Sequence, residues 1–311
     1  HVIMWTGHAK RPVKGGTAFF IHHSCHSAIQ SCLSTKSFAI ARLYNDESTM
    51  SIHIHDCCEI YFSISGGKQF LIDSRVYEFL PGDIFFINQF ESHYLSQVDQ
   101  DTHERVVLSI HPEYLKRLST PQTALDYCFT CRDAAFGHRL SLSQEERKRF
   151  MYFVHRLSET QAYGQDVLDQ AVFLEMMAFL NHAFLSRMAQ SASPVRERAS
   201  TPHYAQIDGI LSYINQHLAE PLSIPMLASH FYLSSSYLCK IFKDATGTTI
   251  NRYITAKRIS RAKALLAEGH PVAETSSLCG FGDYSNFLKS FTKIVGIPPK
   301  KYASYQRGEG G

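Results

Sequence analysis

The sequence has 311 residues, of which 44% are hydrophobic and 19% are charged, a composition typical of a soluble globular chain that is long enough for two domains. No apolar run approaches the roughly 18 to 20 residues that span a bilayer, and no signal-peptide pattern begins the chain, so we expect a cytoplasmic protein with no membrane partner. Residues 1–203 carry 19 basic and 21 acidic residues (net −2), whereas residues 204–311 carry 12 and 7 (net +5), which gives the second part a modest attraction for nucleic acid.

The first part of the chain, residues 17–190, is expected to fold as one domain of strands followed by helices. From Phe38 to Ile110, short runs of Ile, Phe, Val and Tyr alternate with turn signals such as SGGK and LPGD, which predicts antiparallel strands in a barrel or sandwich. Between Ser143 and Met188 the apolar residues recur at helical spacing, so two long helices should follow the sheet. These helices carry more apolar residues than one sheet face needs, which favours a dimerisation hairpin.

The eight cysteines of the chain lack the density of a secreted disulfide scaffold and are therefore interpreted as reduced thiols. Cys128 and Cys131 form a single C-x-x-C pair, for which a structural role is favoured because no second such pair and no histidine tract accompanies it. Cys57 and Cys58 are adjacent on an expected strand, so one of them should face the interior. A thiol switch there is an alternative to simple packing.

A linker and a repeat organise the rest of the chain. The small, polar stretch at residues 191–203 is interrupted by Pro194 and ends beside Pro202, which predicts a linker. Residues 204–306 are expected to form an all-α domain of short helices that end at Gly and Pro. Five identities recur in it at an offset of 49 residues, which indicates two copies of one unit: Ser236, Lys240, Phe242, Gly247 and Tyr253 correspond to Ser285, Lys289, Phe291, Gly296 and Tyr302.

Each copy has the sequence form of a helix-turn-helix. In the first, Ser223 is the expected N-cap of a short helix and Ser234 begins the second helix. In the second, a helix over residues 272–279 leads through a turn at Gly280 into a helix over residues 285–295. The polar residues expected on the outer faces of the two second helices are Ser236, Cys239, Lys240 and Lys243, and then Ser285, Asn286, Lys289 and Lys293.

A single pair of short helices is more often a packing unit with a solvent-exposed face than a DNA-recognition motif. The duplication of the unit favours DNA binding. The segment between the copies, residues 249–267, would span roughly 28 Å as a helix at about 1.5 Å per residue. Two reading helices at that separation suit successive major grooves on one side of B-DNA, about 34 Å apart.

The repeated unit resembles the DNA-binding domain of the AraC/XylS transcription regulators over about 100 residues, 204–306. The sequence departs from the family pattern at Thr275-Ser276, where Ile-Ala is usual, and at Ala303, where Arg commonly follows the final Tyr. The matching motifs are Leu233-Ser-x2-Tyr237-Leu238-x2-Ile241-Phe242-Lys243, Gly247, Arg258, Ala262, Leu265 and Leu266, then Gly280-Phe281-x-Asp283-x-Ser285-x-Phe287, Phe291 and Gly296-x-Pro298-Pro299-x2-Tyr302.

The resemblance implies a sequence-specific regulator of transcription that binds double-stranded DNA and is not an enzyme. In the family pattern, Asn286 and Lys289 fall on the base-facing side of the second recognition helix, as Ser236, Cys239 and Lys240 do on the first. The side chain of Asn is suited to adenine and that of Lys to guanine. A homodimer is expected, and RNA polymerase is a further candidate partner. For four basic residues, phosphate contact and a merely solvated or ion-paired role are left as equal alternatives: Arg258, Arg261, Lys300 and Lys301.

The first domain carries two histidine motifs, His53-x-His55-x3-Glu59-x6-Gly66 and Gly82-x5-Asn88-x-Phe90-x2-His93. Their spacing resembles the two cupin motifs, with Asn88 and Phe90 where cupins usually have Pro and Gly. The resemblance implies a cupin-like β-barrel, and thus an α+β protein of two domains. It also implies a cavity into which four side chains point: His53, His55, Glu59 and His93.

Three roles are open for this set of residues. AraC-type regulators commonly bind a small organic effector without a metal, so effector contact is favoured, with a sugar or related metabolite as the class that the resemblance suggests. The same nitrogen and oxygen donors would suit Fe, Mn, Ni or Zn. The third role is that of satisfied barrel residues. No cofactor is expected, and the alternative to an effector-controlled regulator is a metal-dependent cupin enzyme with a DNA-binding tail.

Overall fold

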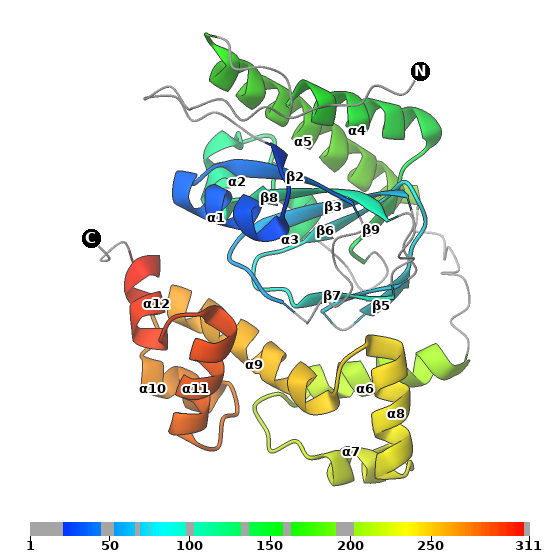
Figure 1. The fold of residues 1–311 in the computed structure, drawn as a ribbon, viewed down its shortest axis with the longest axis vertical. Helices are drawn as coiled ribbons and strands as arrows, with labels where there is room; N and C mark the ends of the chain where they lie inside the picture. The colour runs from blue at the N-terminus through cyan, green and yellow to red at the C-terminus, as the bar shows by residue number, and fades with distance from the viewer. Residues whose placement is uncertain are drawn as a thin grey trace.

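The computed structural model describes residues 21–44, 53–65, 69–73, 75–97, 103–131, 137–157, 163–190 and 202–307. A strand-rich N-terminal domain lies against a helical C-terminal domain (Figure 1), as the sequence predicts. The expected linker, residues 191–203, falls outside the described residues except for its last two positions. No helix among the described residues is long and apolar enough to cross a membrane.

The strands of the N-terminal domain form two sheets. The larger sheet has the spatial order β1-β2-β8-β3-β6-β9 and the smaller sheet has the order β5-β4-β7. Apart from the parallel pair of β1 and β2, the paired strands are antiparallel, as expected. Their bounds are β1 (Ile21–His22), β2 (Phe38–Tyr44), β3 (Cys58–Ser65), β4 (Gln69–Ile72), β5 (Arg75–Glu78), β6 (Asp83–Ile87), β7 (His93–Gln97), β8 (Glu104–Ile110) and β9 (Arg139–Ser141).

The larger sheet is buried on both faces. Along β3, Ile60 and Phe62 pack toward the helices, whereas Tyr61 between them packs toward the smaller sheet with Phe70 and Phe85. Side chains of a strand alternate between its faces, so an uninterrupted run of buried residues, such as that at the start of β3, belongs to a sheet covered on both sides. The space between the two sheets is therefore the interior that the histidine motifs border.

Helices cover the outer face of the larger sheet. Helix α4 begins with a capping box, in which Ser143 and Glu146 bond to each other's backbone N–H groups, and α4 and α5 are the two helices expected after the sheet. They lie on the side of the sheet away from the C-terminal domain (Figure 1). The helices of this domain are α1 (Cys25–Thr35), α2 (Pro112–Leu118), α3 (Tyr127–Thr130), α4 (Gln144–Arg156) and α5 (Gln165–Gln190).

The C-terminal domain consists of two helix-turn-helix units that share one long helix, α9. The predicted N-cap Ser223 is confirmed, and Ser234, the predicted start of the second helix, is the N-cap of α8, because each side-chain oxygen accepts a hydrogen bond from the first turn of its helix. One apolar cluster packs the first unit and another packs the second, and α9 contributes to both. The helices are α6 (Pro202–Gln216), α7 (Ile224–His230), α8 (Ser235–Thr246), α9 (Ile250–Ala267), α10 (Val272–Leu278), α11 (Tyr284–Val295) and α12 (Pro299–Gln306).

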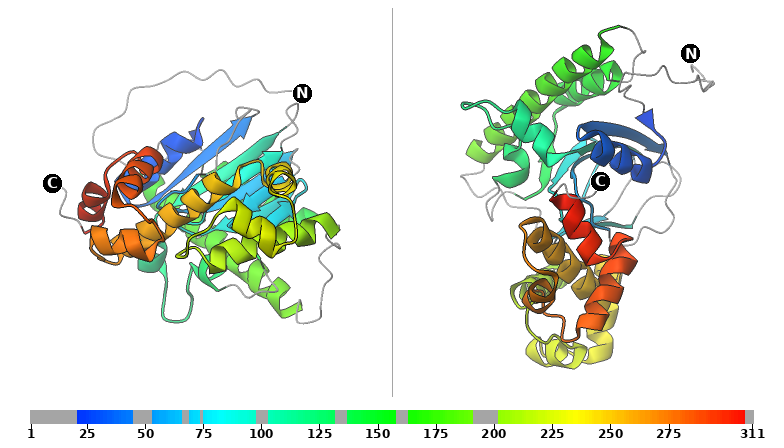
Figure 2. Two further views of the ribbon diagram at one scale, coloured as in Figure 1. Left: turned by 90° about the horizontal axis from the view of Figure 1, so that it is seen from below. Right: turned by 90° about the vertical axis from the view of Figure 1, so that its left-hand side faces the viewer.

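The two domains are packed together through the smaller sheet. Leu71 of β4 is buried in the apolar cluster of the first helix-turn-helix unit, with Val76 and Tyr94 packed at its edge. Figure 2 shows α6 and α9 running across this sheet, and the view turned about the vertical axis shows both units below it. Because Leu71 is 1% exposed, separating the domains would expose an apolar side chain to water.

The second unit depends on glycine at its turn. Gly280 has φ +77°, and a Cβ atom there would lie 2.4 Å from the carbonyl oxygen of Leu218, which belongs to the first unit. Gly296 has a similar φ of +86° but nothing within 4 Å of its Cβ position. Gly280 is therefore required by both backbone conformation and space, whereas Gly296 is required by conformation alone.

We expect Gly296→Ala to lower the free energy of unfolding by about 1 to 2 kcal/mol, the cost of a left-handed non-glycine residue. Gly280→Ala should lose at least about 1 kcal/mol more, because a backbone carbonyl cannot move aside as a side chain can. Chemical denaturation of the full chain and the two variants measures both values. Equal losses would mean that the approach of Gly280 to Leu218 is unimportant.

Candidate functional site

Helix α8 presents a polar outer face above an apolar inner face. Leu238, Ile241 and Phe242 are buried in the core of the first unit. The four predicted reading residues lie on the opposite side, where Ser236, Lys240 and Lys243 are exposed and Cys239 is partly buried against the core. Cys239 thus offers less surface to a ligand than the other three.

Helix α11 repeats this arrangement in the second unit. Phe287 and Phe291 are fully buried, whereas the predicted reading residues Ser285, Asn286, Lys289 and Lys293 are exposed. The N-cap is Asp283, whose carboxylate accepts hydrogen bonds from the backbone N–H groups of Ser285 and Asn286. Sequence reasoning missed this cap, although an Asp just before an amphipathic run is a recognised signal for one.

The remaining basic candidates divide into two groups. The guanidinium of Arg258 donates to the carbonyl oxygens of Leu218 and Glu220, at 3.0 and 2.8 Å, and lies over the ring of Phe281. Arg258 is thus engaged in holding the two units together, by hydrogen bonds and ring contact rather than by an ion pair. The residues that are exposed on the domain surface are Arg261, Lys300 and Lys301.

Both departures from the family pattern occupy buried positions. Thr275 and Ser276 are buried, and the Thr275 hydroxyl donates to the carbonyl oxygen of Pro271 at 2.9 Å. Ala303 is also buried, in the apolar cluster of the second unit. A hydroxyl that bonds within its own helix costs little to bury, so these residues are compatible with a packed second unit.

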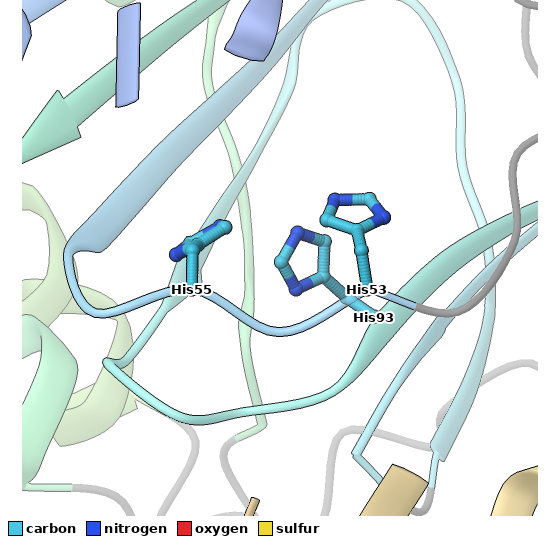
Figure 3. Close-up of side chains that lie close together, drawn as sticks. All are labelled: His53, His55 and His93. Carbon is cyan, nitrogen blue, oxygen red and sulfur yellow. The ribbon is translucent and has the colours of Figure 1, made fainter. Parts of the chain in front are cut away.

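Three of the four predicted cavity residues, His53, His55 and His93, lie close together in Figure 3. His53 and His55 precede β3, Glu59 lies on β3, and His93 begins β7 and pairs with His53 through two backbone hydrogen bonds. His53, His55 and His93 offer ring nitrogens that all lie within 4.8 Å of one another. His55 Nε2 is 2.9 Å from Glu59 Oε2, and His93 Nε2 is 3.8 Å from the same oxygen. We refer to these four residues as the His/Glu cluster.

Burial and mutual contact set the charges of the cluster. Burial by itself would lower the pKa of His55, but interactions with Cys57 and Glu59 outweigh it and raise that pKa well above its usual value. Burial would raise the pKa of Glu59, yet the neighbouring histidines lower it to about 2. Burial, followed by the proximity of His53, lowers the pKa of His93 well below its usual value. The His55–Glu59 pair is therefore ionic, whereas His93 is neutral.

The donor set fits a divalent transition-metal ion. Imidazole nitrogens and a carboxylate oxygen are suitable ligands for such ions. His93 Nε2 is buried and has no hydrogen-bond partner, although a buried polar atom normally has one. If a metal is bound, it supplies a Lewis-acid centre for oxygen atoms of a ligand.

The thiols next to the cluster have raised pKa values. Contact with Cys32, followed by burial, raises the pKa of Cys57 well above its usual value, and burial raises the pKa of Cys58 to about 12. A buried, protonated thiol is a poor nucleophile, which argues against the alternative of a thiol switch. In the C-x-x-C pair, Cys128 is buried and Cys131 is exposed, and both are free cysteines.

Sequence reasoning also missed the polar contacts between the domains. Lys257 of α9 pairs with Asp73, and Lys263 of the same helix pairs with Asp56. Both lysines are buried, at 8% and 3% exposure. The signal that could have revealed them is the presence of two lysines on the apolar face of α9, where Lys is costly to bury unless it is paired.

Comparison with known proteins matches one family model to part of each domain. Residues 36–165 match the AraC-like ligand binding domain and residues 227–305 match a helix-turn-helix domain. The transcriptional activator RhaR of Escherichia coli K12 is 22% identical over 269 residues, which cover 86% of this chain and 91% of RhaR. The probable transcriptional regulator LumQ of Photobacterium leiognathi is 35% identical over 97 residues, and the match covers 31% of this chain and only 39% of LumQ. The crystal structure of ToxT from Vibrio cholerae O395 aligns with 88% of this chain and 99% of its own at 13% identity and a TM-score of 0.36.

We expect Glu59→Ala to lower the free energy of unfolding by about 3 to 5 kcal/mol, because it leaves the charged ring of His55 buried without its partner. The measurement is chemical denaturation in the presence of a chelator, so that no metal compensates. Glu145→Ala is the matched control, since it removes the exposed Lys148–Glu145 pair and should change stability by no more than about 0.5 kcal/mol. A loss at Glu59 as small as this would show that the pair is not ionic.

Proposed function

As a member of the AraC family of transcriptional regulators, this chain is a DNA-binding regulator with a ligand-binding domain, and we propose that α8 and α11 read two successive major grooves of one operator. The observation that carries this proposal is the pair of exposed polar faces on two helices that are joined by α9. Helix α9 has 18 residues and is therefore about 27 Å long. That length is close to the roughly 34 Å between successive grooves.

The base-reading residues that we propose in α11 are Asn286 and Lys289, because their amide and ammonium groups are exposed and suit base edges. In α8 we propose Ser236 and Lys240, with a smaller contribution from Cys239. The residues proposed for phosphate contact are Lys243, Ser285, Lys293, Arg261, Lys300 and Lys301.

We further propose that a small polar effector, a sugar or related metabolite, enters the space between the two sheets and is bound at the His/Glu cluster. The support for this is chemical, since four polar side chains at the end of an apolar interior are costly to bury unless they contact a ligand or one another. The effector would control how the DNA-binding domain is presented, which is a shift between states rather than catalysis. RhaR, which matches most of the chain, is named as a transcriptional activator, so we do not propose the enzyme alternative.

A homodimer formed through α4 and α5 completes the proposal. Tyr152, Val167, Leu168 and Leu185 are large apolar residues of these helices that are between 43% and 66% exposed. An apolar surface of this kind is typical of a protein interface. Helices α4 and α5 lie on the side of the N-terminal domain away from the DNA-binding domain (Figure 1), so two chains joined through them keep both DNA-binding domains accessible, also to RNA polymerase.

In a footprinting experiment with the full chain and a duplex selected from a random pool, we expect protection of two major grooves about one helical turn, roughly 10 bp, apart. Residues 204–306 contain both units and should account for this pattern. Protection of a single groove would mean that one unit is only structural.

We expect Asn286→Ala and Lys289→Ala each to weaken binding by about 1 to 3 kcal/mol at one base pair and to relax the sequence preference there. Lys300→Ala is the control for phosphate contact, because it should weaken binding equally on all sequences. Binding titrations on the selected duplex and on single-base variants of it distinguish the two patterns. Uniform weakening by Asn286→Ala would contradict a base-reading role.

A further inference from the structure

Backbone carbonyl groups orient two rings of the His/Glu cluster, those of His55 and His93. His55 Nδ1 is 2.9 Å from the carbonyl oxygen of Cys57, and His93 Nδ1 is 3.0 Å from the carbonyl oxygen of Glu91. A carbonyl can only accept, so Nδ1 of each ring carries the proton that it donates. Nε2 of both rings then faces Glu59, at 2.9 Å in His55 and 3.8 Å in His93.

These contacts are those of a metal site. Metal-binding histidines usually donate their other ring N–H to a backbone carbonyl or a carboxylate, which fixes the ring for coordination. Ligand atoms on one ion at about 2.1 Å lie roughly 3 to 4 Å apart. The 2.9 and 3.8 Å separations from Glu59 fall in this range, and the ring nitrogens within 4.8 Å of one another need only small side-chain movements.

His93 supplies the decisive observation. Its ring is 1% exposed and its Nε2 has no hydrogen-bond partner. An unsatisfied buried nitrogen lone pair is unfavourable in a folded protein, and the neighbouring carboxylate and imidazoles can all become metal ligands once the proton between His55 Nε2 and Glu59 is released. A divalent cation that displaces this proton is the partner that satisfies all of these groups together.

The loops that carry the cluster are also the loops that hold α9. Asp56, next to His55, pairs with Lys263 and accepts a hydrogen bond of 3.1 Å from the hydroxyl of Tyr302. The carbonyl oxygen of Phe90 accepts a hydrogen bond from Ser260 of α9, while the Phe90 N–H donates to the carbonyl oxygen of His55 at 3.0 Å. One residue, Phe90, is thus bonded to the cluster on one side and to the DNA-binding domain on the other.

A third contact follows the same pattern. Asp73 pairs with Lys257, and its carbonyl oxygen accepts a hydrogen bond of 2.7 Å from the hydroxyl of Tyr253. Its N–H donates to the carbonyl oxygen of Ser92, the neighbour of His93. Asp73 and Phe90 have φ angles of +54° and +65°, a left-handed conformation that is unfavourable for residues other than Gly and is held only by surrounding contacts.

From these contacts we propose that the His/Glu cluster binds one divalent transition-metal ion, and that the metal-bound loops brace α9 through Asp56, Phe90 and Asp73, which tightens binding to DNA. The proposal rests on the function proposed above and names the ion as the group through which a polar effector is held. The reading faces of α8 and α11 stay exposed in this arrangement, so the contact acts by fixing α9 between the two units and not by covering them. A metal that orders both loops would therefore favour one spacing of the reading helices.

Metal binding is tested first and without DNA. Metal ions are first removed from the full chain under reducing conditions. The chain is then titrated with Co²⁺, and binding is followed by visible absorption. Competition with Zn²⁺ measures the affinity. We expect one ion per chain, with the spectrum of nitrogen and oxygen ligands and no thiolate charge-transfer band. A thiolate band, or no binding above that of the variant described next, would overturn the site.

His93→Asn is the informative variant, because an Asn amide can still donate to the carbonyl oxygen of Glu91 while the Nε2 ligand is lost. It removes no hydrogen bond of the metal-free protein, since Nε2 has none. We expect Co²⁺ affinity to fall by at least about 100-fold, because loss of a ligand should cost no less than the upper range for loss of a residue that only supports a ligand. The double variant His23→Ala/His26→Ala, which removes two exposed histidines, is the control and should bind as the parent does. Loss of binding in the control instead would place the ion elsewhere.

Coupling to DNA is tested on a duplex selected with the metal-loaded chain. We expect Co²⁺ or Zn²⁺ to tighten binding by about 10-fold, within the usual 5- to 150-fold range of allosteric coupling. In Asp56→Asn/Lys263→Met, which removes both charges of the buried pair at once, the ion should still bind while its effect on DNA affinity is lost. Circular dichroism confirms that this variant is folded.

The outcomes separate the two proposals. A chain that binds DNA specifically but takes up no Co²⁺ in the titration would overturn the metal site and leave the regulator intact. Metal binding that does not change DNA affinity in the parent would overturn the bracing role. One bound ion without any sequence-specific DNA binding would contradict the proposed function while supporting the metal site.

Discussion

Two buried ammonium groups determine how the domains of this protein fit together. Lys257 and Lys263 of α9 are almost fully removed from water, and burial lowers the pKa of Lys257 to about 8. A buried charge is tolerated only when an opposite charge and hydrogen bonds replace its hydration. Those charges, on Asp73 and Asp56, come from the N-terminal domain. The position of α9, and with it the spacing of the two helix-turn-helix units, therefore depends on loops of the other domain.

The same constraint explains why the His/Glu cluster lies where it does. The carboxylates that meet the lysines are on loops at the end of the smaller sheet, and the backbone of those loops is bonded to residues 53–55 and 92–93. A ligand at the cluster needs to move these loops by only a fraction of an ångström to change two buried ion pairs. Packed interiors respond to such shifts by changing between discrete arrangements, so a small local event can have a large effect at α9.

The sequence predicts the parts of this protein better than their arrangement. The helix cap Ser223, the two histidine motifs and the repeat at 49 residues are local patterns, and each led to an element that the structure contains. The ion pair of Lys257 with Asp73 joins residues 184 positions apart, and no local pattern indicates which carboxylate a buried lysine will meet. Cys57 and Cys58 could not be assigned to a face until the register of β3 was known, because a shift of one residue exchanges them.

Phe90 illustrates how a departure from a family pattern acquires meaning in three dimensions. It occupies a position where cupins usually have Gly, and its left-handed φ of +65° accounts for that preference. A phenylalanine in this conformation is unfavourable by itself, but its ring lies 5.6 Å from the Lys263 ammonium and its carbonyl oxygen bonds to Ser260. Contacts with the second domain thus offset backbone strain in the first. A chain without the second domain would keep the strain and lose the compensation, so glycine is the better residue there, whereas the side chain is useful only in a protein whose two domains meet at this loop.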